Sequence, residues 1–205
     1  MSKRLDQGFR RSVHATLKLL HPTLKISRQS KDTLQQMLQD VLDRIIHEAV
    51  GCRLHKRVLP RDIQTAVSLV LPPTMAKQAS SAAIGALARH DSVGGGGRVT
   101  GGSGGGGSGE SITTRHSKRA GLLVSVSKVR SNVVAHHNML ISVQAAIVVA
   151  ATLEYILAEI LSGSGLWVQK DRRVVLTTRD IGKTLKRYSD IRALFGPAVV
   201  VHHAK

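Results

Sequence analysis

Apolar residues recur at intervals of three and four along two long stretches of the chain. In residues 31–53 the stripe consists of Leu34, Leu38, Val41, Ile45 and Ala49. This spacing predicts an amphipathic helix of about six turns. In residues 143–167 the apolar stripe is broader, which predicts a second long helix that is covered on more than one side.

Shorter helical patterns surround the two long ones, at residues 9–20, 60–71, 74–90, 126–135 and 179–188. Pro60 suits the first position of its helix, because its missing N–H has no intrahelical partner there. Ser27 or Ser30 is a candidate N-cap for the first long helix, and Thr177 or Thr178 for the last short one. Less regular patterns predict a short turn or helix at 117–121, one turn at 190–195 and an extended segment at 198–201.

A glycine-rich run, residues 94–109, separates two segments of similar size. Glycine loses more backbone freedom on ordering than any other residue, and this run has almost nothing to bury in return. It therefore predicts a flexible linker with an average span of roughly 22 Å. The expected organisation is a folded segment at 1–93, a linker at 94–110 and a second folded segment at 111–205.

Both segments follow one plan, in which short helices flank a long helix and basic connectors join them. The clearest match aligns residues 56–70 with 172–188, and both pass from basic residues into Arg-Asp-Ile at a helix start. A long helix of this kind cannot bury both faces alone. The repeat predicts an all-α pseudo-dimer with crossed long helices and connectors paired between the halves. The pairs would place Lys25, Ser27 and Arg28 beside Arg172 and Arg173, and Ser142 beside Lys56 and Arg57.

The formal charge is +17, from 30 Lys and Arg against 13 Asp and Glu. The excess is even, with a net +8 in residues 1–93 and again in 110–205. This distribution predicts a polyanion that contacts both halves; nucleic acid is the first candidate and an acidic membrane surface the second. The apolar run 140–161 contains Gln144, Glu154 and Glu159, and its longest uninterrupted part is too short to span a bilayer. We expect a buried core helix and no membrane partner.

The candidate chemical groups favour structural roles. Cys52 has no second cysteine to pair with, and adjacent histidines such as His136 and His137 rarely satisfy a tetrahedral metal alone. The glycine run lacks the Gly-Lys-Ser/Thr ending of a phosphate loop. We therefore expect no catalytic, cofactor or metal site, and a protein that is not an enzyme.

Several segments resemble histones. Residues 9–90 contain LKLLHPTLKIS, DVLDRIIHEA and KRVLPRDIQTAVSLVLP, which resemble a histone of the 2B class. Residues 115–201 contain SKRAGLL, AATLEYILAEIL and RDIGKTLKRYSDIRALFG, which resemble a histone of the 2A class. A fused pair in this order is similar to the histone doublets of giant DNA viruses of the Marseilleviridae type.

The resemblance implies two tandem histone folds that form an intramolecular handshake pseudo-heterodimer. It implies a nucleosome-core-type protein that wraps duplex DNA without base specificity. The expected protein partners are a histone three/four-like heterodimer or doublet and a second copy of this chain in an octamer-like particle. The location would be a chromatin-like particle: in the virion, viral factory or host nucleus for a viral protein, and in the nucleus for a cellular one.

Only some of the family's DNA-contacting residues are present in this sequence. Val175 stands at the position of a minor-groove arginine, and Lys128 replaces another, so the charge is kept but the guanidinium fork is lost. The candidate DNA-binding residues are Lys25, Ser27, Arg28, Lys56, Arg57, Lys118, Arg119, Lys128, Ser142, Arg172 and Arg173. Of the family's acidic surface patch only Glu154, Glu159 and Asp190 are kept. We therefore expect weaker attachment of partners that use this patch.

One alternative of another class stays open, a histone-fold subunit of a transcription-regulatory complex. Such a protein binds a chosen DNA site or serves as an assembly platform. The sequence shows no additional arm or insertion for reading bases, which favours the packaging hypothesis.

Overall fold

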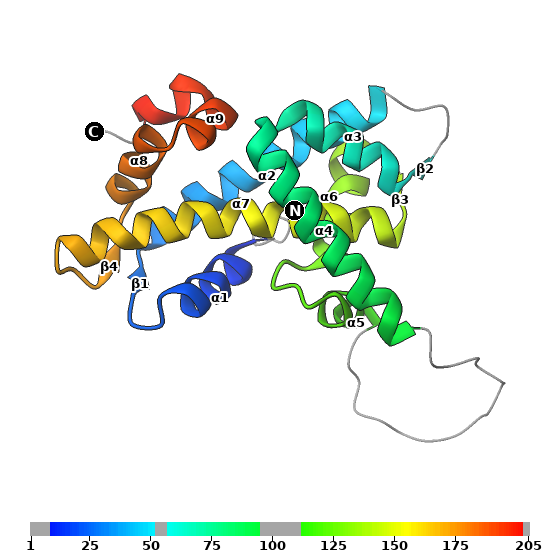
Figure 1. Cartoon of the computed structure of the whole chain (residues 1–205), viewed down its shortest axis with the longest axis horizontal. Helices are drawn as coiled ribbons and strands as arrows, with labels where there is room; N and C mark the ends of the chain where they lie inside the picture. The colour runs from blue at the N-terminus through cyan, green and yellow to red at the C-terminus, as the bar shows by residue number, and fades with distance from the viewer. Residues whose placement is uncertain (1–8, 52–56, 95–111, 203–205) are drawn as a thin grey trace, which may run out of the picture.

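The computed structural model describes residues 9–51, 57–94 and 112–202, and this part of the chain is all-α, with only four two-residue strands between its helices (Figure 1). The first half contains α1 Arg10–Leu20, β1 Lys25–Ile26, α2 Arg28–Gly51, β2 Arg57–Val58, α3 Pro60–Val70 and α4 Pro73–Gly94. The second contains α5 Ile112–Ala120, α6 Val126–His137, β3 Leu140–Ile141, α7 Val143–Lys170, β4 Val175–Leu176, α8 Thr178–Arg187 and α9 Ser189–His202.

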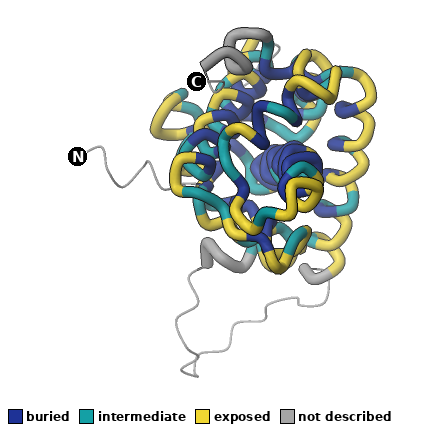
Figure 2. The backbone as a smooth tube through the Cα atoms, turned by 90° about the vertical axis from the view of Figure 1, so that its left-hand side faces the viewer, coloured by how far each residue is buried: buried dark blue, intermediate teal, exposed yellow. Residues whose placement is uncertain are grey.

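Helix α7 is the centre of the molecule. Its residues from Ala145 to Leu153 are all buried. Helices α1, α3 and α4 of the first half pack against it, as do α6 and α8 of its own half. Figure 1 shows α4 crossing over α7, and the helix seen end-on at the centre of Figure 2 is buried. The broad apolar stripe thus has the cover on several sides that the sequence predicted.

By length and composition α7 could also cross a bilayer, since the mean hydropathy of its most apolar window is 1.8. However, 72% of that window is buried inside the protein. The prediction of a core helix is therefore confirmed for α7.

The connectors pair between the two halves, as the repeat predicted. Strand β1 runs parallel to β4, with Lys25 opposite Val175 and Ile26 opposite Leu176. Strand β2 runs parallel to β3, with Arg57 opposite Leu140 and Val58 opposite Ile141. Because β3 immediately precedes α7 and β4 follows it, the two pairs lie at opposite ends of that helix (Figure 1).

Two segments differ most from the sequence predictions. The segment 198–201 is not extended, because α9 continues to His202 beyond a break at Gly196, where φ is 71°. Only glycine adopts this conformation at little cost, and Pro197 then suits the first turn of the resumed helix. Helix α5 begins at Ile112, earlier than the turn predicted at 117–121. The linker prediction for 94–110 lies outside the described residues except for Gly94, the last residue of α4.

Two glycines allow neighbouring helices to approach the C-terminal part of α7. A Cβ at Gly163 would lie 2.7 Å from Thr184 Cγ2 on α8. A Cβ at Gly165 would lie 2.1 Å from Nε2 of His21, which follows the last residue of α1. The sequence Gly-Ser-Gly thus fixes how closely both halves pack on α7.

We expect Gly165→Ala to lower the free energy of unfolding by about 1–2 kcal/mol, because the added methyl group displaces the His21 ring. Chemical denaturation monitored by circular dichroism measures this change. In a His21→Ala background the same substitution should instead stabilise the protein by up to about 1 kcal/mol, since alanine is the better helix former.

Gly85→Ala in α4 is the matched control, because its Cβ would meet only Arg89 Nη1 at an ordinary 3.5 Å. It should be stabilising in both backgrounds. Equal effects of Gly165→Ala and Gly85→Ala would contradict the proposed close contact between His21 and α7.

Candidate nucleic-acid interface

The pair of β1 with β4 gathers cations at one end of α7. Lys25 N donates a hydrogen bond to Val174 O at 2.7 Å, and Ser27 N donates to Leu176 O at 3.0 Å. The side chains of Lys25, Arg28 and Arg172 are exposed here. Three of the predicted DNA-binding cations therefore occupy the connectors that the backbone pairing joins.

The pair of β2 with β3 forms the equivalent site at the other end. Ser142 N donates to Val58 O at 3.1 Å, which extends the pairing to the start of α7. Arg57 is exposed. Lys56, the other predicted cation of this connector, lies outside the described residues. Since α7 has 28 residues, the two sites are separated by roughly 40 Å along its axis.

A helix begins directly beside each pair. Ser27 Oγ accepts a hydrogen bond from Ser30 N at 3.1 Å at the start of α2. Ser142 Oγ accepts from Ala145 N at 3.1 Å at the start of α7. The predicted DNA-binding serines therefore act as N-caps and hold the positive ends of the two long helices toward the connectors. A helix N-terminus favours a phosphate through its remaining N–H groups and its dipole.

Arg173 has a structural role that the sequence prediction did not include. Its Nη1 donates to Asp180 Oδ2 at 3.1 Å and its Nη2 to Asp171 Oδ2 at 3.0 Å. The hydrogen bond to Asp180, followed by that to Asp171, raises the pKa of Arg173 above its ordinary value. The guanidinium of Arg173 therefore holds the connector between α7 and α8 in place. The neighbouring Arg172 is the more exposed of the two cations.

Asp180, which accepts a hydrogen bond from Arg173, is itself buried. It also accepts hydrogen bonds from Thr177 N at 3.0 Å and Thr177 Oγ1 at 2.8 Å. Burial on its own would raise the pKa of Asp180, but the hydrogen bonds from Arg173 and Thr177 outweigh it and lower that pKa. Asp62 accepts from Leu59 N at 2.8 Å at the same position of α3. The aspartate of each Arg-Asp-Ile motif thus fixes a helix start.

The last turn of α5 and the first turn of α6 provide a third basic region, beside the start of α1. Ser12 Oγ donates to Leu123 O at 3.0 Å, which joins α1 to the segment before α6. Ser125 caps α6 by accepting from Lys128 N. The predicted cations near this junction are exposed: Lys118 and Arg119 on α5 and Lys128 on α6.

The sequence interpretation missed two cations, Arg61 and Arg179. Both are exposed and lie in the first turns of α3 and α8, next to the capping aspartates Asp62 and Asp180. Each motif therefore turns its aspartate toward the backbone and its arginine toward solvent. The repeated Arg-Asp-Ile was the signal that could have identified them.

Of the three acidic residues that the sequence assigned to a surface patch, Glu154 has its carboxylate hydrogen-bonded to backbone N–H groups. Its Oε2 accepts hydrogen bonds from Leu123 N at 2.6 Å and Val124 N at 2.9 Å. Burial raises the pKa of Glu154, although these two bonds oppose the change. This carboxylate therefore holds the segment between α5 and α6, and it contributes less to a surface patch than the sequence suggested.

Glu159 and Asp190 line a hollow of about 250 Å³ together with Tyr155. The Asp190 carboxylate accepts a hydrogen bond from Thr74. Burial, followed by the charges of Glu159 and Asp190, raises the pKa of Tyr155 to about 12. The acidic surface between α4, α7 and α9 is therefore formed by Glu159 and Asp190. It is smaller than the patch of three carboxylates that the sequence predicted, because Glu154 is bound to the backbone.

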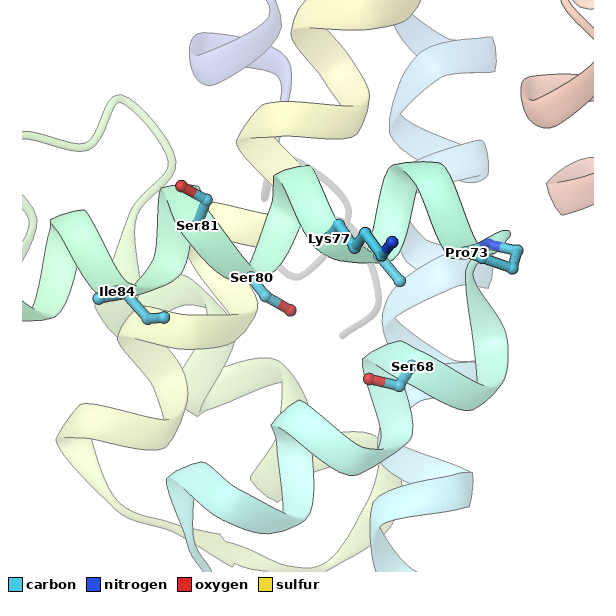
Figure 3. A pocket seen from close by; sticks show the side chains of 7 residues that line it. Ser68, Pro73, Lys77, Ser80, Ser81 and Ile84 are labelled. Carbon is cyan, nitrogen blue, oxygen red and sulfur yellow. The ribbon is translucent and has the colours of Figure 1, made fainter.

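A second hollow, of about 550 Å³, lies between α3 and α4. Figure 3 shows Ser68 on one of these helices and Lys77 and Ser80 on the other. Lys77 is the only charged side chain in its lining, which includes no carboxylate or imidazole. These lining residues offer no pair of groups that could act as general acid and base.

No protein-family model matches the chain.

We expect Asp180→Asn to lower the free energy of unfolding by about 1–3 kcal/mol, because the neutral amide cannot accept all the hydrogen bonds that the buried carboxylate takes from Arg173 and Thr177. Denaturant titration measures the change. Asp171→Asn is the matched control: this exposed carboxylate contacts the same arginine, and its loss should have a much smaller effect.

The effect of Asp180→Asn should also depend on pH. The folded-state pKa of Asp180 is lowered, so its stabilising contribution is present above the unfolded-state value of about 3.9 and is lost as the pH falls through the folded-state pKa. The difference between wild type and Asp180→Asn should therefore shrink below about pH 4. A difference that stays constant between pH 7 and pH 3 would contradict this role.

Proposed function

We propose that the chain is a fused pair of histone folds that binds and wraps duplex DNA without base specificity. Each half has one long helix, α2 or α7, between shorter helices. The connectors of one half run parallel to those of the other, β1 with β4 and β2 with β3. This crossed pairing is the arrangement that an intramolecular histone handshake requires, and the sequence resemblance independently favours it.

The observation that carries the DNA-binding proposal is the coincidence of cations and helix N-termini at both connector pairs. Lys25 and Arg28 lie where α2 begins, and Arg57 lies beside the start of α7. Both features attract phosphate. The separation of the two sites by roughly 40 Å suits a duplex that follows the surface over more than one turn.

Contacts of this kind do not read bases. Cations and backbone N–H groups bind phosphate oxygens, which are the same in every sequence. The chain would therefore bind duplex DNA with a steep salt dependence, because each neutralised phosphate releases counterions. This property favours DNA packaging over site-specific transcription regulation.

The proposed assembly includes a histone three/four-like pair and a second copy of this chain, in a chromatin-like particle. The engagement of Glu154 by the backbone and the contact between Asp190 and Thr74 support the expectation of a weak acidic patch. Partners that dock through such a patch would bind this particle less tightly.

Reconstitution tests the proposal. The full chain is mixed with a histone three/four pair and a long duplex and is then digested with micrococcal nuclease. We expect a protected DNA fragment of fixed length that is absent when either protein component is omitted. A continuous smear at every protein ratio would count against a wrapped particle.

Competition binding separates packaging from transcription regulation. Affinities for many duplexes of different sequence should agree within about tenfold, because phosphate contacts carry no sequence information. A selected sequence that binds thousands-fold more tightly than random duplex would favour the regulatory alternative.

A further inference from the structure

Two histidines meet where α4 and α5 pack together (Figure 1). Nε2 of His90 on α4 lies 3.0 Å from Nδ1 of His116 on α5, within hydrogen-bonding distance, and the ring centroids are 5.3 Å apart. Arg89 Nε also donates a hydrogen bond to Ala120 O at 2.9 Å between the same two helices. The imidazole pair is therefore one of the polar contacts that hold α5 against α4.

Asp91 determines which nitrogen of His90 carries a proton. Its Oδ1 lies 3.2 Å from Nδ1 of His90, and a carboxylate only accepts, so Nδ1 donates to it. When His90 is neutral, its Nε2 therefore accepts a hydrogen bond from Nδ1 of His116. When His90 is charged, its Nε2 donates, and His116 must be neutral to accept. The contact thus accommodates one added proton, whereas a second would place two N–H groups against each other.

The charges around the pair oppose that second proton. Burial, followed by the charges of His90 on α4, Arg130 on α6 and Arg119 on α5, lowers the pKa of His116 below its ordinary value. The carboxylate of Asp91 contacts the nitrogen of His90 that faces away from His116. In the folded protein His116 is therefore neutral at neutral pH.

Other charged groups on the surrounding helices act elsewhere. Arg89 of α4 and Glu154 of α7 interact with each other, and Glu154 accepts a hydrogen bond from Leu123 N at 2.6 Å. Lys118 is exposed on α5 itself. This surplus of cations disfavours a metal ion, and the described residues contain no group of three side chains that could hold one. The pair therefore suits a contact that protons control.

We propose that His90 and His116 form a pH-sensitive latch, which holds α5 on α4 at neutral pH and releases it when both imidazoles are charged. In the released state His116 titrates as an exposed histidine does, with a pKa of about 6.5. Docking of α5 is therefore fully stable above that value and weakens as the pH falls through the lower folded-state pKa.

The two latched helices flank residues 95–111 in the sequence. Release of α5 therefore lengthens the connection between the two halves by one helix and leaves the core around α7 intact. This inference goes beyond the proposed function and does not depend on DNA binding.

Hydrogen exchange of the full chain, corrected for the intrinsic rate at each pH, tests the latch. The amides of Gly121 and Leu122 report on α5, because they donate to Lys118 O and Ser117 O. Between about pH 7.5 and about pH 5 their protection should fall, by at most about 30-fold if docking excludes one proton. The amide of Ile156 in α7 should keep its protection.

Two substitutions remove the titration but keep a hydrogen-bonding atom in place. The amide group of asparagine reaches the position of Nδ1, and that of glutamine reaches the position of Nε2. His116→Asn and His90→Gln should therefore each keep α5 docked and lose most of the fall in protection. His47→Gln is the matched control, because the His47 side chain on α2 is 85% exposed, and it should show the same fall as the wild type.

Glu154 provides the competing explanation, since burial raises its pKa and it holds the segment after α5. It remains titratable in every variant, so a fall in His116→Asn as large as in the wild type would assign the effect to Glu154 and overturn the latch. Unchanged protection of Gly121 and Leu122 in the wild type would also overturn it, as would an equal loss at Ile156. If His116→Asn does not hold α5 at neutral pH, His90→Gln decides by the same criterion.

Discussion

The burial of α7 is the constraint on which the rest of the structure depends. Its stretch from Ala145 to Leu153 has no exposed side, and removing that much apolar surface from water is the largest favourable contribution available to a small helical protein. Its own half supplies α6 and α8, and the first half supplies α1, α3 and α4. One half alone would leave a large part of this helix in water.

This shared core also explains why the connectors are held in fixed positions at the two ends of α7. Ile26 and Leu176 at one end, and Val58 and Ile141 at the other, pack into or against the same core that buries α7. The backbone bonds between the halves therefore hold the outward cations Lys25 and Arg57 in fixed positions. A surface that is rigid before binding would lose less conformational entropy in the DNA complex that we propose.

The sequence predicted most helices and the crossed connectors, because periodicity and an internal repeat report on burial directly. It did not predict how individual polar groups are used. Arg173 and Glu154 were assigned to surfaces, but the fold directs the first to a buried aspartate and the second to backbone N–H groups. The contact of Glu154 joins residues 31 positions apart, whereas Arg173 and Asp180 are only seven positions apart and their contact depends on the burial of Asp180 in the folded protein. The helix through residues 198–201 was missed because β-branched residues favour strands locally, whereas the break at Gly196 and Pro197 allows a new helical turn.

Native-state hydrogen exchange on the full chain tests most directly whether the two halves form one cooperative core. The amides of Lys25, Ser27 and Ser142 donate between the halves, whereas that of Ile156 lies within α7. If the halves unfold as one unit, these four amides should exchange with the same free energy of opening and respond equally to denaturant. Exchange of the three connector amides at much lower free energy, with Ile156 still protected, would contradict the shared core.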